Sequence, residues 1–227
     1  MRLLLFDIDG TLLTCGPQVL PIFSSSLEAV FGTTGTLTGY DFGGKTDPQI
    51  VLDLMTAAGL SRDEVLRRLP RMRDAYVSRL EAELSPEGMR VMPGVREILD
   101  ELMRREDQAV GLLTGNWERG GRAKLAALDL DDYFPFGAFG DDGVARADLV
   151  PAALARAEQR FGRAFAPSET LIIGDTVYDV ACAQAHGVPV LAVATGRTPE
   201  SRLREAGADW TVPHLPAALD LLGLGAP

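Results

Sequence analysis

The sequence predicts an α/β protein: a parallel sheet with helices on both faces, interrupted near its start by a helical insert. From residue 95 onward, apolar runs alternate with helix signals, which is the order that builds a parallel sheet. Residues 14–89 instead carry helix signals without a strand candidate between them. The chain has 227 residues, 46% of them hydrophobic, which is enough to bury the core of such a domain together with an insert.

The core sheet is predicted to begin with residues 2–6. This short apolar run lacks alternation, which is typical of a strand buried on both faces of a parallel sheet. The remaining strands are expected at 109–113, 136–139, 170–173, 190–194 and 210–212. Helices are expected at 94–105, 118–127, 148–161, 177–186, 199–206 and 215–222. The first strand therefore joins this sheet although the insert separates it from the others.

The insert is predicted to be a small helical bundle. Its helices are expected at 18–31, 48–59 and 61–84. Asp47 is the predicted N-cap of the second helix, with Pro48 as its first residue. Ser61 opens the third helix with a capping box. We expect Pro70 to break or restart this third helix, because proline cannot donate a backbone hydrogen bond.

Composition narrows the classes of partner. The formal charge of −10 and the pI near 4.7 argue against binding to nucleic acid or to an anionic membrane surface. No apolar stretch of the sequence reaches membrane-spanning length. Cys15 and Cys182 cannot form a disulfide framework, so the reducing cytoplasm is the expected compartment. We expect a monomer or a weak homodimer.

The first motif is Asp7-Ile-Asp9-Gly10, directly after the first strand. Residues two apart in an extended chain point the same way, so both carboxylates face one cavity, and Gly10 permits a tight turn. Ligand sites in such sheets lie beyond the carboxyl ends of the strands. Two close carboxylates repel each other unless a cation or a shared proton stabilises them, and Mg²⁺ prefers oxygen ligands. A calcium loop or an ordinary acidic turn would also explain this motif alone.

The second motif is Thr114-Gly115-Asn116, which follows the apolar run 110–113. A small hydroxyl and free backbone N–H groups at the entry to a helix form an anion site. Thr114 can donate a hydrogen bond to a phosphoryl oxygen, while Gly115 lets the backbone approach closely. An ordinary helix N-cap after a strand is the competing interpretation.

The third motif, Gly174-Asp175 followed by Asp179, comes after the apolar run 171–173. Asp179 lies four residues after Asp175, on the same face of the first helical turn. Acidic residues also stabilise a helix N-terminus, so simple capping explains part of this pattern. Asp175 adds a third carboxylate at the end of a strand, which completes the predicted cation site.

Taken in this order, the three motifs resemble the haloacid dehalogenase (HAD) superfamily over essentially the whole chain. The insert is similar to the helical cap of the phosphoglycolate phosphatase-like members. The resemblance implies a Rossmann-like core formed by 1–13 and 90–227, and an α-helical cap at 14–89. It also implies magnesium-dependent hydrolysis of a small phosphate monoester, of the phosphoglycolate or sugar phosphate type.

The resemblance also assigns roles to the carboxylates. Asp7 would be the nucleophile that forms an aspartyl-phosphate. Asp9 would be the general acid that protonates the leaving oxygen and then the base that activates water. Mg²⁺ would be held by the Asp7 carboxylate, the Asp9 backbone carbonyl and Asp175. Asp179 would hold these ligands in place without binding Mg²⁺ itself.

The phosphoryl group would be held by Thr114 and by the amides of Gly115 and Asn116. The family's usual third motif places a lysine between the second and last motifs, and this chain has Arg146 there. Arginine can clamp two phosphoryl oxygens but is not interchangeable with lysine. Lys124 is the rival cation, and its position in a predicted helix favours a solvated helix face instead.

Lys45 lies in the insert just before a helix, where caps of this superfamily often carry substrate-selecting residues. It is a candidate for binding a carboxylate or a second phosphate, and a loop lysine in water is the alternative. An imine-forming lysine, as in phosphonoacetaldehyde hydrolases, ranks lower. Other readings of the whole chain are a β-phosphoglucomutase-like phosphomutase and a catalytically silent binding module. A dehalogenase is disfavoured because carbon–halogen displacement needs no leaving-group acid.

Overall fold

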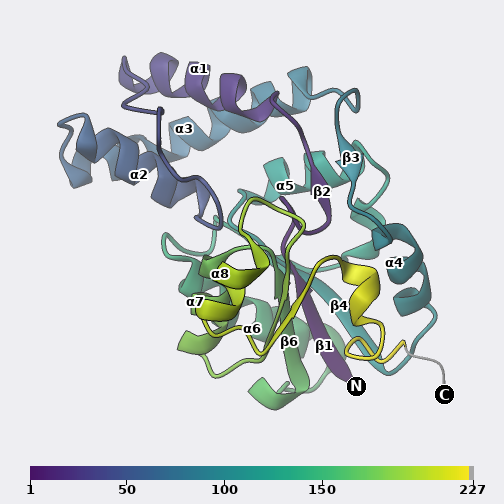
Figure 1. The fold of residues 1–227 in the computed structure, drawn as a ribbon. Helices are drawn as coiled ribbons and strands as arrows, with labels where there is room; N and C mark the ends of the chain where they lie inside the picture. The colour runs from purple at the N-terminus through teal and green to yellow at the C-terminus, as the bar shows by residue number, and fades with distance from the viewer. Residues whose placement is uncertain (225–227) are drawn as a thin grey trace.

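The computed structural model describes residues 1–224 of the chain, and its core is a six-stranded parallel sheet (Figure 1). The strand order is β5-β4-β1-β6-β7-β8, with every neighbouring pair parallel. The strands are β1 (Arg2–Phe6), β4 (Gln108–Leu113), β5 (Gly137–Ala138), β6 (Thr170–Gly174), β7 (Val190–Val193) and β8 (Trp210–Val212). This confirms the predicted α/β class and parallel sheet.

The apolar run of β1 is buried on both faces of the sheet. Leu4 and Phe6 belong to one hydrophobic cluster, and Leu3 and Leu5 belong to another. Alternate residues of a strand face opposite sides, so each cluster fills one face. The first cluster is covered by α4 (Val95–Met103) and α5 (Glu118–Ala126). The second is covered by α6 (Leu149–Phe161), α7 (Val177–Ala185) and α8 (Glu200–Glu205).

The insert forms a helical layer with its own hydrophobic core. Figure 1 shows α1 (Val19–Phe31), α2 (Asp47–Ala57) and α3 (Arg62–Glu83) together, on the side of the sheet toward which β1 runs. This arrangement confirms the predicted helical cap. Within residues 1–224, no helix combines the length and apolarity that a bilayer crossing requires.

A two-stranded antiparallel ribbon joins the ends of the insert. Leu13 of β2 (Leu13–Thr14) pairs with Val91 of β3 (Arg90–Val91). Strands of two residues carry no recognisable pattern, so sequence reasoning could not find them. The boundaries of the core at 1–13 and 90–227 and of the cap at 14–89 stay a prediction. Of these, residues 225–227 lie outside the described residues.

The prediction that Pro70 breaks or restarts the third cap helix was wrong. Helix α3 runs unbroken from Arg62 to Glu83 with the proline inside it. An internal proline costs roughly 3 kcal/mol of helix stability. The burial of Met72, Tyr76 and other apolar side chains of α3 in the cap core offsets this cost. Tertiary packing therefore keeps the helix continuous.

Two further local predictions were wrong. The N-cap of α2 is Thr46 rather than Asp47, because the Thr46 hydroxyl accepts the hydrogen bond from the Gln49 N–H. The predicted helix at 215–222 is a short 3₁₀ turn at Leu215–Ala218. The other predicted strands and helices are present within about two residues of the expected ends.

Candidate active site

The ends of β1, β4 and β6 bring the three sequence motifs together. Phe6 at the end of β1 lies opposite Leu112 of β4 and Ile173 of β6. The Asp7 N–H donates to the Ile173 carbonyl at 2.9 Å, which continues this register by one residue. The residues that follow these strands therefore surround one position at the edge of the sheet. Asp175 is one of them.

Three buried carboxylates form an acidic cluster at this edge. Ligand oxygens of Asp7, Asp175 and Asp179 all lie within 4.8 Å of one another. Burial raises the pKa of Asp7 to about 6. Burial, followed by the nearby charges of Asp7 and Asp179, raises the pKa of Asp175 to about 8. Such a group of buried oxygens fits a hard divalent cation, whose charge would offset both effects.

Glycines at two positions leave room for the Asp175 carboxylate. Gly10 has a φ of +87°, and a Cβ there would lie 2.4 Å from Asp175 Oδ2. A Cβ on Gly196, in the loop after β7, would lie 1.6 Å from the same oxygen. The sequence motifs identified Gly10 and missed Gly196, which belongs to no motif.

The raised pKa values predict how pH and metal affect stability. Asp7 and Asp175 hold protons in the native protein at pH values where the unfolded chain has released them. Between 3.8, the ordinary Asp pKa, and about 8, the native state therefore binds more protons than the unfolded state. This contribution to stability falls as pH rises through that window. Mg²⁺ requires the ionised carboxylates, so it should stabilise the protein more at about pH 8 than at about pH 5.

Thermal melting in EDTA and in Mg²⁺ across this pH range checks the prediction. The matched variant is Asp175→Asn, which removes the carboxylate with the larger shift and should reduce the stabilisation by Mg²⁺. A stabilisation by Mg²⁺ that is unchanged in Asp175→Asn would contradict a cation site here.

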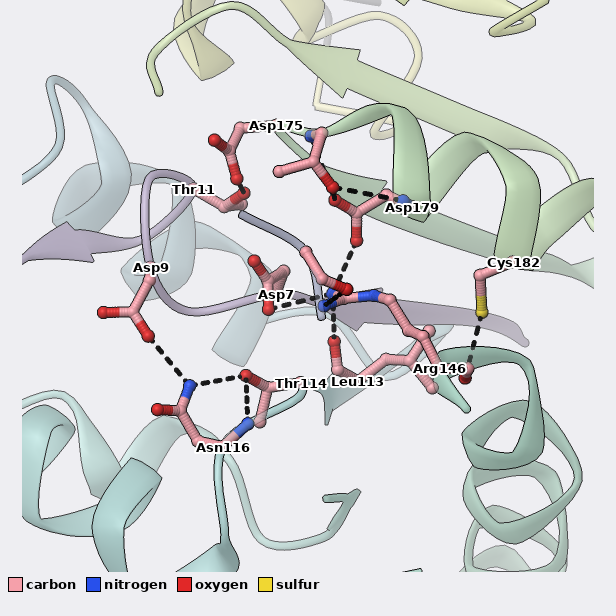
Figure 2. Close-up of polar contacts among 12 residues, drawn as sticks. Asp7, Asp9, Thr11, Leu113, Thr114, Asn116, Arg146, Asp175, Asp179 and Cys182 are labelled. Carbon is pink, nitrogen blue, oxygen red and sulfur yellow. Dashed lines mark hydrogen bonds and ion pairs between the residues drawn. The ribbon is translucent and has the colours of Figure 1, made fainter. Parts of the chain in front are cut away.

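The Arg146 guanidinium lies between Asp7 and Asp179 of the acidic cluster (Figure 2). Its Nη2 is 3.0 Å from Asp7 Oδ1 and 2.5 Å from Asp179 Oδ1, and it also donates to the Leu113 carbonyl at 3.1 Å. Its Nη1 donates to the Gly44 carbonyl of the cap at 3.0 Å. The guanidinium therefore contacts the predicted nucleophile, the supporting aspartate and the cap at once.

Asp179 is fully buried and holds the start of α7. Its Oδ2 accepts hydrogen bonds from the Thr176 N–H at 3.0 Å and the Thr176 hydroxyl at 2.6 Å, while Oδ1 pairs with Arg146. Capping thus accounts for part of the third motif. Because both oxygens of Asp179 already have donors, Asp7 and Asp175 are the better candidates for direct cation ligands.

The Asp9 carboxylate lies outside the acidic cluster. Figure 2 shows it turned toward Asn116, whose Nδ2 donates to Asp9 Oδ2 at 2.8 Å. The same Nδ2 donates to the Thr114 hydroxyl oxygen at 2.8 Å. The Asp9 side chain is 44% exposed, whereas the Asp7 side chain is 6% exposed. The two aspartates of the first motif therefore have different environments.

The prediction that Lys124 lies on a solvated helix face was wrong. The residue is 3% exposed, and its Nζ lies 2.7 Å from Asp9 Oδ2 and 2.6 Å from Asn116 Oδ1. Burial lowers the pKa of Lys124, but the combined charges of Asp9 and the groups around it outweigh this effect and the pKa is raised. Gly120 and Gly121 share the buried face of α5. These two small residues one turn earlier were the available signal that this face packs closely.

Lys45 does not point its ammonium at the acidic cluster. Its Nζ lies 3.0 Å from the Tyr40 hydroxyl oxygen and 3.0 Å from Asp53 Oδ2, and 4.2 Å from the centre of the Tyr40 ring. Burial lowers the pKa of Lys45, but the hydrogen bonds with Tyr40 and Asp53 outweigh it and raise the pKa. Lys45, which was predicted to bind substrate, therefore has its polar partners, Tyr40 and Asp53, within the cap.

The backbone around Lys45 nevertheless meets the second motif. The Asp47 N–H donates to the Gly115 carbonyl at 2.8 Å, and the Trp117 N–H donates to Asp47 Oδ2 at 2.8 Å. A Cβ on Gly115 would lie 2.1 Å from the Lys45 carbonyl oxygen. The missing side chain of Gly115 thus admits the cap backbone, and the cap loop lies over the edge that carries the acidic cluster.

Comparisons with known proteins agree with this fold. The family model described as haloacid dehalogenase-like hydrolase matches residues 1–187. A protein named phosphoglycolate phosphatase from Rhodobacter capsulatus is 28% identical over 220 residues, which is 96% of either chain. One of the same name from Nitrosospira multiformis is 28% identical over 226 residues, covering 98% of this chain and 96% of that one.

Among solved structures, a haloacid dehalogenase-like hydrolase from Streptococcus pneumoniae has the same fold. Its TM-score is 0.65 at 20% sequence identity, and the match covers 98% of this chain and 97% of that chain. The family match extends from the first motif through the third, and so includes every strand end that forms the acidic cluster. The chain belongs to the family of haloacid dehalogenase-like hydrolases.

Proposed function

We propose that this hydrolase is a Mg²⁺-dependent phosphatase that acts on small phosphate monoesters through an aspartyl-phosphate. The observation that carries the proposal is the contrast between Asp7 and Asp9. Asp7 is buried and contacts the Arg146 guanidinium. Asp9 is half-exposed, and its carboxylate accepts hydrogen bonds from Asn116 and Lys124. Two carboxylates in unlike environments suit two roles, a nucleophile and an acid–base group.

In the first step, an Asp7 carboxylate oxygen attacks phosphorus and the ester P–O bond breaks. Asp9 gives its proton to the leaving oxygen, which departs as an alcohol. In the second step, Asp9 takes a proton from water, the water oxygen attacks phosphorus, and the Asp7–phosphate bond breaks. Inorganic phosphate leaves, and Asp7 and Asp9 return to their initial states.

The remaining residues hold the phosphoryl group and its charge. The Thr114 hydroxyl and the Gly115 and Asn116 amides would donate to phosphoryl oxygens, and Arg146 carries a fixed positive charge at Asp7. Bound by Asp7, Asp175 and the Asp9 carbonyl, Mg²⁺ would supply charge neutralisation for the phosphoryl oxygens.

The substrate class follows from the cap and from the relatives. The cap loop hydrogen-bonds to Arg146 and Gly115, which places cap backbone against the edge that carries the acidic cluster. We therefore propose that the substrate is a small phosphorylated metabolite, of the phosphoglycolate or sugar phosphate type. The relatives named phosphoglycolate phosphatase support phosphoglycolate. The raised pKa of Lys45 disfavours imine chemistry, which needs a neutral amine. The buried free cysteines fit the cytoplasm, and the oligomeric state stays a prediction.

Hydrolysis of a panel of phosphate monoesters, with Mg²⁺ and with EDTA, tests the proposal. We expect release of inorganic phosphate that EDTA abolishes and added Mg²⁺ restores, with phosphoglycolate and sugar phosphates compared by kcat/KM. The panel includes a sugar monophosphate with and without a sugar bisphosphate, because dependence on the bisphosphate would indicate a mutase. Absence of phosphate release from every ester would refute the proposal of a phosphatase.

A further inference from the structure

A buried ammonium lies next to Asp9 and has no role in the steps above. Lys124 comes from α5, after the second motif, and its side chain is 4% exposed. Burying a lysine is costly unless partners satisfy it, and here a carboxylate and an amide oxygen do so at 2.7 and 2.6 Å. Both partners belong to the site: one is Asp9 and the other is Asn116.

The donors around Asp9 converge on one of its two oxygens. Oδ2 accepts from Lys124 Nζ at 2.7 Å and from Asn116 Nδ2 at 2.8 Å. Among residues 1–224, no hydrogen-bond donor contacts Oδ1, and Figure 2 shows this oxygen directed away from Asn116. Two charged or polar donors on one oxygen fix the rotation of the carboxylate and leave the other oxygen to exchange a proton.

Lys124 also sets the orientation of the Asn116 amide. An ammonium only donates hydrogen bonds, so the atom of Asn116 that faces it at 2.6 Å is the carbonyl oxygen. The NH₂ group then points at Asp9 and at the Thr114 hydroxyl oxygen. Because that hydroxyl accepts from Asn116, its own hydrogen is free for a phosphoryl oxygen. One ammonium therefore orients groups in both motifs.

We propose that Lys124 is a positioning residue that aims Asp9 at the leaving oxygen of the substrate. The inference rests on the proposed phosphatase function and deepens it. It predicts that Lys124 matters most where the leaving oxygen needs a proton. An alkoxide leaves poorly without one, whereas a dinitrophenolate is stable as an anion and leaves without general acid catalysis.

The test compares wild type with Lys124→Met on an alkyl phosphate and on 2,4-dinitrophenyl phosphate, using kcat/KM. This ratio reports the steps up to phosphoryl transfer to Asp7. We expect a loss of about 100-fold on the alkyl phosphate and of at most about fivefold on the dinitrophenyl ester. An equal loss on both esters, or no loss, would overturn the positioning role. If wild type hydrolyses neither ester, it is the phosphatase proposal that fails.

A double-mutant cycle with Asp9→Asn adds a readout that a structural role would not produce. If Lys124 acts through Asp9, Lys124→Met in the Asp9→Asn background should cost no more than about twofold on the alkyl phosphate. A full further loss in that background would contradict the inference.

The control variant is Arg104→Met, which removes a positive charge from an exposed side chain whose ion-pair partner is Glu101. We expect this variant to match wild type on both esters. If Lys124→Met fails to fold, Lys124→Gln replaces it, because an amide keeps a donor for Asp9. A larger loss on the alkyl phosphate than on the dinitrophenyl ester, at reduced size, supports the inference, whereas equal losses on both esters reject it.

Discussion

Replacement of Asp7 by Asn is expected to abolish phosphate release, with a loss of at least about 10⁴-fold in kcat. An amide cannot attack phosphorus as a carboxylate does, so the aspartyl-phosphate cannot form. Acid quenching of the reaction should trap phosphate on wild-type protein and none on Asp7→Asn. The release of inorganic phosphate under saturating substrate measures the loss itself.

Asp7→Asn should retain its fold, which separates catalysis from stability. The change removes a charge from a cluster of buried carboxylates, and Arg146 keeps its partners Asp179, Leu113 and Gly44. We expect its melting temperature without metal to equal or exceed that of wild type, as is common when an active-site charge is removed. The matched control is Asp132→Asn at an exposed position, which should retain full activity. Substantial turnover by a folded Asp7→Asn would refute the nucleophile assignment.

Replacement of Arg146 by Met is expected to lower both stability and activity. The guanidinium is 5% exposed, and its loss leaves Asp7 and Asp179 buried without their cation. Removal of one partner from such a buried pair costs about 3–5 kcal/mol in the free energy of unfolding. Urea unfolding with EDTA measures this cost, and kcat/KM should fall by at least about 100-fold because phosphoryl charge is no longer neutralised.

Arg146→Lys distinguishes the charge of this residue from its shape. Lysine retains a positive charge near Asp7, but one ammonium does not reproduce the fork that places Nη2 on Asp7 and Nη1 on Gly44. We therefore expect kcat to stay within about tenfold of wild type and KM to rise, because the cap loop loses a hydrogen bond. A wild-type KM for Arg146→Lys would show that the contact with Gly44 is dispensable.

The sequence alone was enough to predict that the three motifs lie together at one edge of the sheet. Apolar runs without alternation mark strands covered on both faces, and parallel strands end at one edge of the sheet. Asp7, Thr114 and Asp175 each follow such a run, so their convergence follows from local pattern and the sheet's geometry. The family match then confirmed the class of protein that these motifs indicated.

Only the tertiary structure decided that Lys124 faces these carboxylates as well as Arg146, and how the cap meets them. Lys124 and Asp9 are 115 positions apart in the chain, and Arg146 and Gly44 are 102 apart. Pairs at such separation depend on how whole elements pack, and no local periodicity encodes them. The same holds for Pro70, whose cost is offset by burial in the cap core. Local sequence thus determined the strands and the polar residues at their ends, while long-range packing determined the partners of each charge.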